Sequence, residues 1–367
     1  MTVIDSIHAA LATVEDPEIH RPLPDLGMVE SVQADGGVAR LKILLTISGC
    51  PMQDRLRTDI TKAVMAVESI SSVEITFGVM DEEQRGKLKS LLRNGREKII
   101  PFAQPESLTR VIGIASGKGG VGKSSLTVNL AVAAASKGLR VGILDADVYG
   151  HSVPRLMGLI GQRPTAIDQM FIPLEAYGVK VVSMEMFKPE RSDAVAYRGP
   201  LLHKVLEQLL SDAYWGDLDL LLIDLPPGTG DLAISLGQLI PGSEILVVTT
   251  PQEAAQKVAR LSAAMAKKVN LPVRGVIENM SWFTGDDGKR YELFGSGGGQ
   301  ELADELGVPL LAQIPLTMAL REGGDDGKPI AAVAPDSETG KAFHALAAQV
   351  DAMKPKKLFS KGLKLLG

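Results

Sequence analysis

The chain has 367 residues, of which 45% are apolar and 23% are charged, so it can bury a sizeable core and form two or three domains. Its formal net charge of -5 gives no general reason to expect binding to nucleic acid or to an anionic membrane. The single cysteine, Cys50, excludes an intrachain disulfide and an all-cysteine metal site within one chain, which fits a reducing compartment. The first residues lack the pattern of a signal peptide and the apolar runs are too short to span a bilayer, so we expect a cytoplasmic protein.

Residues 1–95 have the pattern of a small α+β domain. Helical spacing comes first, and two β-rich runs follow that Asp35-Gly36-Gly37 joins as a hairpin turn. Another helix, a strand and a charged helix complete the order αββαβα. The expected elements are 5–11, 27–33, 38–47, 51–67, 73–79 and 81–93.

A second pattern begins after residues 96–108, which contain Pro101 and Pro105, show no clear period and are expected to form a linker. From 109 to 350, short apolar β-branched runs alternate with helical segments. This alternation predicts an α/β domain with a doubly wound, mostly parallel sheet, and residues 351–367 follow it as a basic tail. The expected strands are 110–115, 139–144, 218–223, 244–249 and 273–277, and the expected helices include 125–137, 200–210 and 252–269.

A glycine-rich segment follows the first of these strands and matches the phosphate-loop pattern Gly-x-x-x-x-Gly-Lys-Ser. Glycines let successive backbone N–H groups turn toward one point, and the helix that follows adds its positive N-terminus there. Lys123 supplies a cation for the β- and γ-phosphates, and Ser124 offers a hydroxyl to Mg²⁺. We therefore expect ATP and Mg²⁺ to bind at Gly117, Lys118, Gly119, Gly120, Val121, Gly122, Lys123, Ser124 and Ser125.

Carboxylates stand at the ends of two other expected strands. Asp224 ends the apolar run 220–223, and Asp145 and Asp147 follow the strand that ends at Leu144. Ligands of open α/β sheets gather at the carboxyl ends of the strands, so we expect all three carboxylates beside the phosphate loop. Asp224 is the expected Walker B residue, and Asp145 and Asp224 are expected around Mg²⁺.

Lys118 makes the loop similar to the deviant Walker A loop of the MinD/ParA/NifH class of ATPases. Three further segments resemble the Mrp/ApbC family of iron-sulfur carrier proteins: LDADVYGHS at 144–152, DLPPGTGD at 224–231 and ENMS at 278–281. Three segments near the N-terminus resemble the small cluster-assembly domain often fused to that family: DPE at 16–18, DLGMV at 25–29 and TISGCP at 46–51. Together the resemblances cover nearly the whole chain except the linker and the tail.

The resemblance implies an ATP-hydrolysing carrier that transfers iron-sulfur clusters to target apoproteins and that forms a homodimer around its nucleotides. Its other partners would be these apoproteins or assembly factors. Lys118 would reach the phosphates bound by the other subunit, where a second cation stabilises charge on the transferred group. Asp147 would orient the attacking water, and Asn279 would contact the adenine. Turnover would be slow, as in a switch.

The chain departs from this family at the expected cluster site. Family members usually carry Cys-x-x-Cys shortly after the Asn-Met-Ser run, but residues 280–294 contain no cysteine. A cluster normally needs four thiolates, and a homodimer of this chain has two. The pair Asp286-Asp287 is expected to be a polar turn, because carboxylates prefer hard cations.

Cys50 allows two interpretations. Because it lies where a strand passes into a helix, its thiol could be acidic and could act as a ligand or a reactive group in cluster transfer. Alternatively, it is a small residue that fills a strand–helix corner.

The basic tail also allows two interpretations. Its lysines and apolar residues after Pro355 are compatible with a membrane-surface helix of the kind that MinD-like ATPases use, or with a solvated end. The second is favoured, so we do not expect a membrane partner. The alternative function is a MinD-like positioning switch that acts at a membrane or partner surface.

Overall fold

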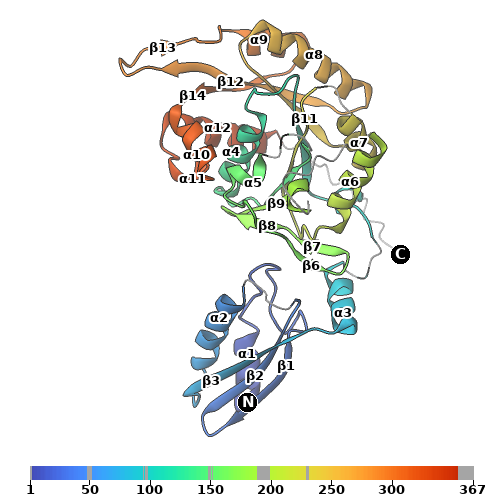
Figure 1. The fold of residues 1–367 in the computed structure, drawn as a ribbon, viewed down its shortest axis with the longest axis vertical. Coiled ribbons are helices and arrows are strands. Elements are labelled where there is room, and N and C mark those ends of the chain that lie inside the picture. The colour runs from blue at the N-terminus through green and yellow to red at the C-terminus, as the bar shows by residue number, and fades with distance from the viewer. Residues whose placement is uncertain are drawn as a thin grey trace, which may run out of the picture. The chain divides into compact units, whose positions relative to one another are not determined.

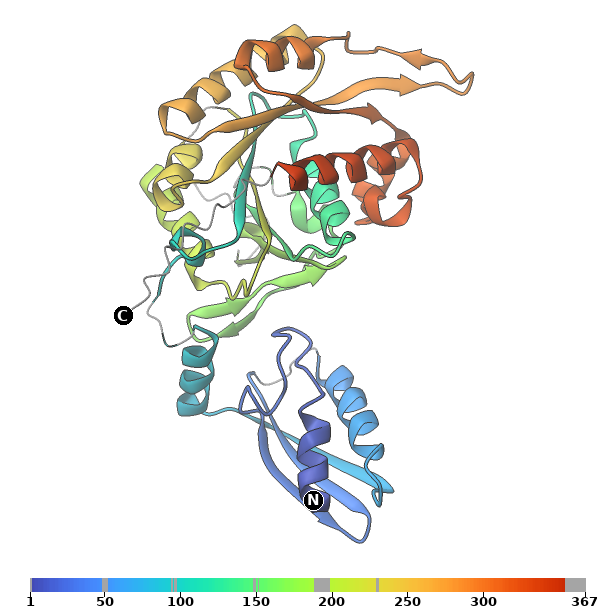
Figure 2. The same ribbon diagram turned by 180° about the vertical axis from the view of Figure 1, so that it is seen from behind.

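The computed structural model describes residues 2–47, 52–93, 95, 98–147, 150, 152–187, 199–228 and 231–353 (Figures 1 and 2). The chain divides into two compact units. One comprises Met1–Ser107, Leu159–Ala176 and Lys180–Asp217, and the other comprises Leu108–Gly158, Tyr177–Val179 and Leu218–Gly367. Cys50 and the tail beyond Met353 lie outside the described residues.

The first unit begins with the predicted order αββαβα. Its sheet has the order β1-β2-β3, with β1 antiparallel and β3 parallel to β2. Capping boxes at Thr2 and Asp81 start two of the helices, where each side chain accepts an N–H that has no partner within the helix. The elements are α1 Val3–Leu11, β1 Val29–Asp35, β2 Val38–Leu45, α2 Gln53–Met65, β3 Ser72–Val79 and α3 Glu82–Leu92.

The hydrophobic core of this unit also includes a short hairpin from much later in the chain. Ile167 of β6 and Met170 and Ile172 of β7 join the core that α1, α2 and the sheet form. Phe102, in the segment expected to be a linker, is buried and lies edge-to-face against Trp215, with ring centroids 6.0 Å apart. The further elements of this unit are η1 Pro101–Ala103, β6 Thr165–Ile167, β7 Met170–Ile172, β8 Leu174–Ala176, η2 Met184–Phe187 and α6 Gly199–Asp212.

The second unit contains most of the predicted mostly parallel sheet. The strand order is β13-β12-β11-β4-β10-β5-β9-β8, and β14 pairs with β12. The pairs β4–β10, β10–β5, β4–β11, β11–β12 and β12–β14 are parallel, so the phosphate-loop strand β4 lies between β10 and β11. The strands are β4 Arg110–Ser116, β5 Val141–Asp145, β10 Leu220–Asp224, β11 Glu244–Thr249, β12 Val273–Thr284, β13 Arg290–Tyr291 and β14 Leu310–Leu316. Strand β9 Val179–Ser183 begins in this unit and continues in the first.

Helices cover both faces of this sheet, which confirms the predicted α/β class (Figures 1 and 2). On one face α4 packs against α11 and α12, and on the other α8 packs against α7 and α9. Strands β4, β10 and β11 are buried along their whole length, as expected of strands covered on both sides. The helices are α4 Lys123–Ala135, α5 Val153–Leu156, α7 Asp231–Leu239, α8 Glu253–Lys268, α9 Gly298–Leu306, α10 Met318–Asp325, α11 Ile330–Val333 and α12 Glu338–Ala352.

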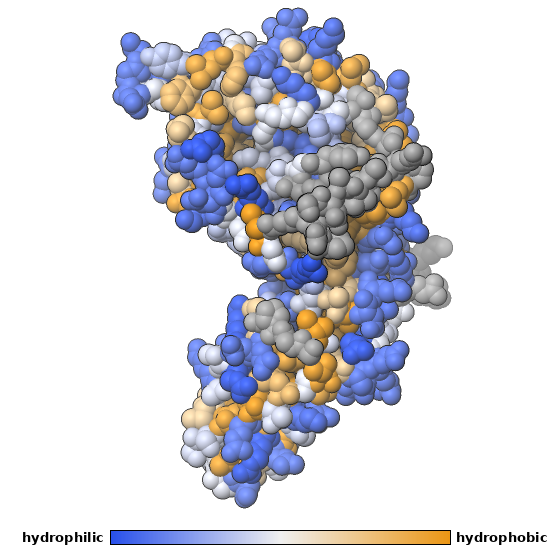
Figure 3. All heavy atoms as spheres, viewed as in Figure 1, coloured by the Kyte–Doolittle hydropathy of each residue, from blue (hydrophilic) through white to orange (hydrophobic). Residues whose placement is uncertain are grey.

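The surface in Figure 3 is mostly hydrophilic, with hydrophobic residues interspersed among the polar ones. Among the described residues, we find no helix that is both long enough and apolar enough to cross a membrane.

Candidate functional site

The predicted phosphate loop connects buried strand β4 to helix α4. Gly120 and Gly122 have φ angles of 80° and 78°, in the left-handed region that favours glycine. Gly122 is also the N-cap of α4, so the loop ends at the N-terminus of a 13-residue helix. The loop borders a cavity of about 540 Å³. The cavity is lined by Ser116, Lys118, Gly119, Gly120, Val121, Gly122, Lys123, Ser124, Ser125, Asp147, Gly150, Ser152, Leu156, Pro226 and Pro227.

Gly117 has a different role from the other loop glycines. A Cβ atom at this position would overlap the backbone of Val258 and Ala259 in α8. The missing side chain therefore lets α8 pack directly on the start of the loop. Ser262, one turn further along α8, donates a hydrogen bond of 2.9 Å to the carbonyl of Gly228, after β10. Helix α8 thus contacts both loops at this edge of the sheet.

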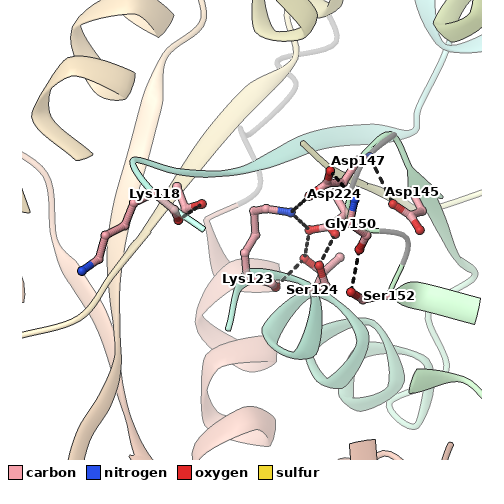
Figure 4. Close-up of polar contacts among 10 residues, drawn as sticks. Lys118, Lys123, Ser124, Asp145, Asp147, Gly150, Ser152 and Asp224 are labelled. Carbon is pink, nitrogen blue, oxygen red and sulfur yellow. Dashed lines mark hydrogen bonds and ion pairs between the residues drawn. The ribbon is translucent and has the colours of Figure 1, made fainter. Parts of the chain in front are cut away.

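Three donors from the start of α4 converge on the carboxylate of Asp224, and Figure 4 labels two of them, Lys123 and Ser124. Lys123 Nζ lies 2.7 Å from Asp224 Oδ1, and Ser124 Oγ lies 2.6 Å from Asp224 Oδ2. Thr127 Oγ1 lies 3.0 Å from Oδ1. Lys123 and Asp224 are both buried, where an unpaired charge is costly, and their ion pair compensates the two charges. The structure brings Lys123, Ser124 and Asp224 together and adds Thr127, which its spacing of one helical turn from Lys123 could have indicated.

The other two predicted carboxylates also lie at this edge. Asp145 pairs in register with Asp224 across β5 and β10, and its Oδ1 accepts the backbone N–H of Asp147 at 3.1 Å. Asp147 Oδ1 accepts the N–H of Gly150 at 3.0 Å, and its Oδ2 lies 3.8 Å from Lys123 Nζ. Asp147 therefore faces the loop, and the hydrogen bond to Asp145 orients the backbone of Asp147.

Lys118 is the one loop lysine that does not join this group. Its side chain points away from Lys123 and the carboxylates, and its Nζ lies 3.1 Å from the side-chain oxygen of Gln252 (Figure 4). Gln252 precedes α8 and carried no motif in the sequence. Its place after β11, at the same edge of the sheet, is the feature that could have drawn attention to it.

Asn279, the predicted adenine contact, supports the phosphate loop. It is buried on β12, and its side-chain Nδ2 donates to the carbonyl of Val121 at 2.9 Å. The same nitrogen lies so close to Gly122 that a Cβ atom there would overlap it. The adenine contact stays a prediction, because it concerns the complex with nucleotide.

The segment in which the resemblance predicts a cysteine pair is a hairpin of β12 and β13. Its turn is closed by Tyr291 Oη, which donates to Asp287 Oδ2 at 2.9 Å. The backbone N–H of Lys289 also donates to Asp287, and these bonds lower the pKa of its carboxyl. In the described part of the chain, no group of three or more His, Cys, Asp or Glu side chains could hold a metal ion.

Two family models of known proteins match this chain, and one of them covers the phosphate loop. A family model described as NUBPL iron-transfer P-loop NTPase matches residues 107–351. The chain belongs to this family of iron-transfer P-loop NTPases. A second model, described as iron-sulfur cluster assembly protein, matches residues 4–77. The chain is thus a nucleotide-binding NTPase with a cluster-assembly domain before it.

Full-length relatives of this iron-transfer NTPase carry both regions. The iron-sulfur cluster carrier protein of Mycobacterium tuberculosis is 50% identical over 351 residues, which are 93% of this chain and 91% of the relative. The protein of the same name from Deinococcus radiodurans is 41% identical over 345 residues, 94% of this chain and 93% of the relative.

Solved structures match the NTPase part. The nucleotide-binding protein of Archaeoglobus fulgidus in complex with ADP is 36% identical with a TM-score of 0.53, over 60% of this chain and 88% of that chain. The cell division ATPase MinD of Pyrococcus furiosus is 26% identical with a TM-score of 0.50, over 66% of this chain and 98% of that chain. The predicted MinD-like fold is therefore confirmed.

Proposed function

We propose that this protein is an ATP-driven carrier that binds iron-sulfur clusters and transfers them to target apoproteins. The names of its full-length relatives support this function. The observation that carries the ATP-dependent part is the convergence of Lys123, Ser124 and Thr127 on Asp224 beside a glycine-rich loop. This arrangement matches the chemical needs of a phosphate-binding site, in which a cation and backbone N–H groups surround the phosphates.

Nucleotide binding would rearrange the side chains around Asp224. The β- and γ-phosphates would become the partners of Lys123, which now pairs with Asp224. The Ser124 hydroxyl and the Asp224 carboxylate are hard oxygen donors of the kind that Mg²⁺ takes together with phosphate oxygens and water. When bound there, Mg²⁺ would neutralise charge on the phosphates. Asp145 would act on this site through Asp147, whose backbone it already holds.

Hydrolysis would require a second copy of the chain. Lys118 is directed to Gln252 and away from Lys123 and the carboxylates of its own site, which fits a lysine that serves the other nucleotide of a homodimer. Asp147 would orient the attacking water, since its carboxylate lies at the rim of the cavity near Lys123. Because the catalytic lysine comes from a partner, turnover would be slow and tied to dimer formation.

The iron-sulfur cluster is what this protein would carry, and the described residues do not provide a site with four thiolates. Two chains contribute two thiolates, both from Cys50, so two further ligands must come from small thiols or from the recipient protein. We therefore propose that the cluster is held weakly, as suits a carrier that must release it.

A transfer assay tests the function. The protein is loaded anaerobically with iron and sulfide in the presence of a small thiol and then mixed with an apoprotein that accepts a [4Fe-4S] cluster. We expect activation of the acceptor to be faster with Mg·ATP than without it, and Lys123→Ala to lose this dependence. Acceptor activation no faster than by iron, sulfide and thiol without the protein would contradict the carrier function.

A further inference from the structure

The resting position of Lys118 is defined by one contact. Its Nζ donates to the side-chain oxygen of Gln252 at 3.1 Å, and both side chains are half-buried. In Figure 4 the lysine extends to the side of the loop opposite to Lys123 and the carboxylates. The two lysines of one loop therefore point in different directions, Lys123 toward Asp224 and Lys118 toward Gln252.

The position of Gln252 relative to the loop is fixed by helix α8. Gly117, which directly precedes Lys118, packs against the backbone of Ala259 so closely that no Cβ atom fits. Ser262 further anchors the same helix through its hydrogen bond to the carbonyl of Gly228. Gln252 is the N-cap residue of α8, so this packing places its side chain within reach of Lys118.

The hydrogen bond between Lys118 and Gln252 should be easy to break. The side chain of Gln252 makes no capping bond to α8, so its oxygen is available to Lys118. An ammonium group near a helix N-terminus meets the positive end of the helix dipole, which only the exposed Glu253 in the first turn offsets within α8. A neutral amide is also a weaker partner for a cation than a phosphate is. Lys118 would therefore leave Gln252 when phosphates come within reach.

We propose that Gln252 is a positioning residue that holds Lys118 at rest until the phosphates bound to a second copy of this chain take it over. This inference rests on the proposed role of Lys118 in a homodimer. The Lys118–Gln252 contact must break as the dimer forms, so its strength sets the ATP concentration and protein concentration at which dimers appear. Gln252 acts through Lys118 and does not touch the nucleotide.

Two substitutions of Gln252 should act in opposite directions. Gln252→Met keeps the size of the side chain and removes the acceptor, so ATP-dependent dimerisation should become about 25-fold tighter, a factor of about five for the one net hydrogen bond in each of the two subunits. Gln252→Glu turns the contact into an ion pair and also suits the N-terminus of α8, so dimerisation should weaken by about the same factor. The dimer constant is measured by sedimentation with Mg²⁺ and a slowly hydrolysed ATP analogue, and the Mg·ADP affinity of the monomer is measured beside it.

Two controls make the result specific to Lys118. Gln300→Met makes the same change at an exposed glutamine of α9 and should shift nothing. In a Lys118→Ala background both Gln252 variants should lose their effect. The inference is overturned if the two variants shift the dimer constant in the same direction, leave it unchanged, or act equally without Lys118. If Lys118→Ala itself dimerises and hydrolyses ATP like the parent, the proposed function of that lysine fails instead.

Discussion

Lys123 and Asp224 form a buried ion pair with 2.7 Å between the lysine Nζ and the carboxylate Oδ1. The residue that should hold phosphate and the residue that should face Mg²⁺ thus neutralise each other. Removing one partner of such a pair leaves the other charge buried and unpaired, which typically costs about 3–5 kcal/mol. We therefore expect Mg·ATP to replace this internal contact when it binds.

Substitutions of the two loop lysines should affect different properties, Mg·ATP binding in one case and ATP hydrolysis in the other. Lys123→Ala should abolish tight binding of Mg·ATP, because the β- and γ-phosphates lose their main cation. Lys118→Ala should keep the Mg·ADP affinity of the parent but lower both hydrolysis and ATP-dependent dimerisation, with turnover falling at least about tenfold. Calorimetric binding, steady-state phosphate release and sedimentation measure the three quantities. Hydrolysis by Lys118→Ala at the parent rate would show that the deviant-loop interpretation is wrong.

Asp147→Asn should trap a dimer with bound ATP. The amide keeps the size of the carboxylate and can still accept the N–H of Gly150, so the local structure should persist. It cannot orient and polarise water as a carboxylate does, so hydrolysis should stop after assembly. Size-exclusion chromatography with ATP should show more dimer than for the parent. A variant that binds ATP and stays monomeric would instead assign Asp147 to structure or to Mg²⁺.

Asn279→Ala should loosen the phosphate loop, because it leaves the buried carbonyl of Val121 without its donor. We expect the affinity for Mg·ATP to fall about tenfold, equivalent to about 1.4 kcal/mol, within the range for an unsatisfied buried group. Binding of inorganic tripolyphosphate should fall by the same factor. If tripolyphosphate binds as before while ATP binds weakly, Asn279 acts through the adenine and its contact with the loop is secondary.

Glu18 should make the stability of the first unit depend on pH. Burial raises the pKa of its carboxyl above the ordinary 4.5, against the hydrogen bond of 2.8 Å that it accepts from Thr165. A raised pKa means that the folded state holds the proton more tightly, so the contribution of Glu18 to stability falls as the pH rises above 4.5. Glu18→Gln keeps an acceptor for Thr165 and loses the titration. Its unfolding free energy should increase relative to the parent between acidic and neutral pH, and a constant difference would contradict this.

Cys50 should control whatever cluster the protein retains. We expect the purified protein to hold no stable [4Fe-4S] cluster through its NTPase part, because residues 107–351 contain no cysteine. A labile cluster formed by reconstitution should disappear in Cys50→Ala, while ATP hydrolysis is unchanged. Iron and sulfide are counted per dimer after gel filtration. Four irons with matching sulfide that persist in Cys50→Ala would overturn this prediction.

Short-range patterns predicted the parts of the site that one segment contains. The loop from Gly117 to Ser124 was identified because phosphate binding needs glycines, a lysine and a hydroxyl at fixed spacing before a helix. Continuous apolar runs located β4, β10 and β11, since strands covered by helices on both faces carry few polar residues. The ends of β10 and β5 then placed Asp224 and Asp147 near the loop, because parallel strands end at a common edge.

Contacts between distant segments could not be predicted in this way. Strands β6 and β7 have three residues each, too few to show a period, and pairing and burial in the core of the first unit define them. Strand β12 runs on through Glu278 and Asn279, which interrupt its apolar pattern and yet are buried because other segments supply their hydrogen bonds. The direction of Lys118 was decided by Gln252, 134 residues away, because β11 lies beside β4 and α8 packs on Gly117. The sequence by itself indicated which residues are expected to bind phosphate. The tertiary structure decided which side chain each lysine contacts, because that depends on which strands become neighbours.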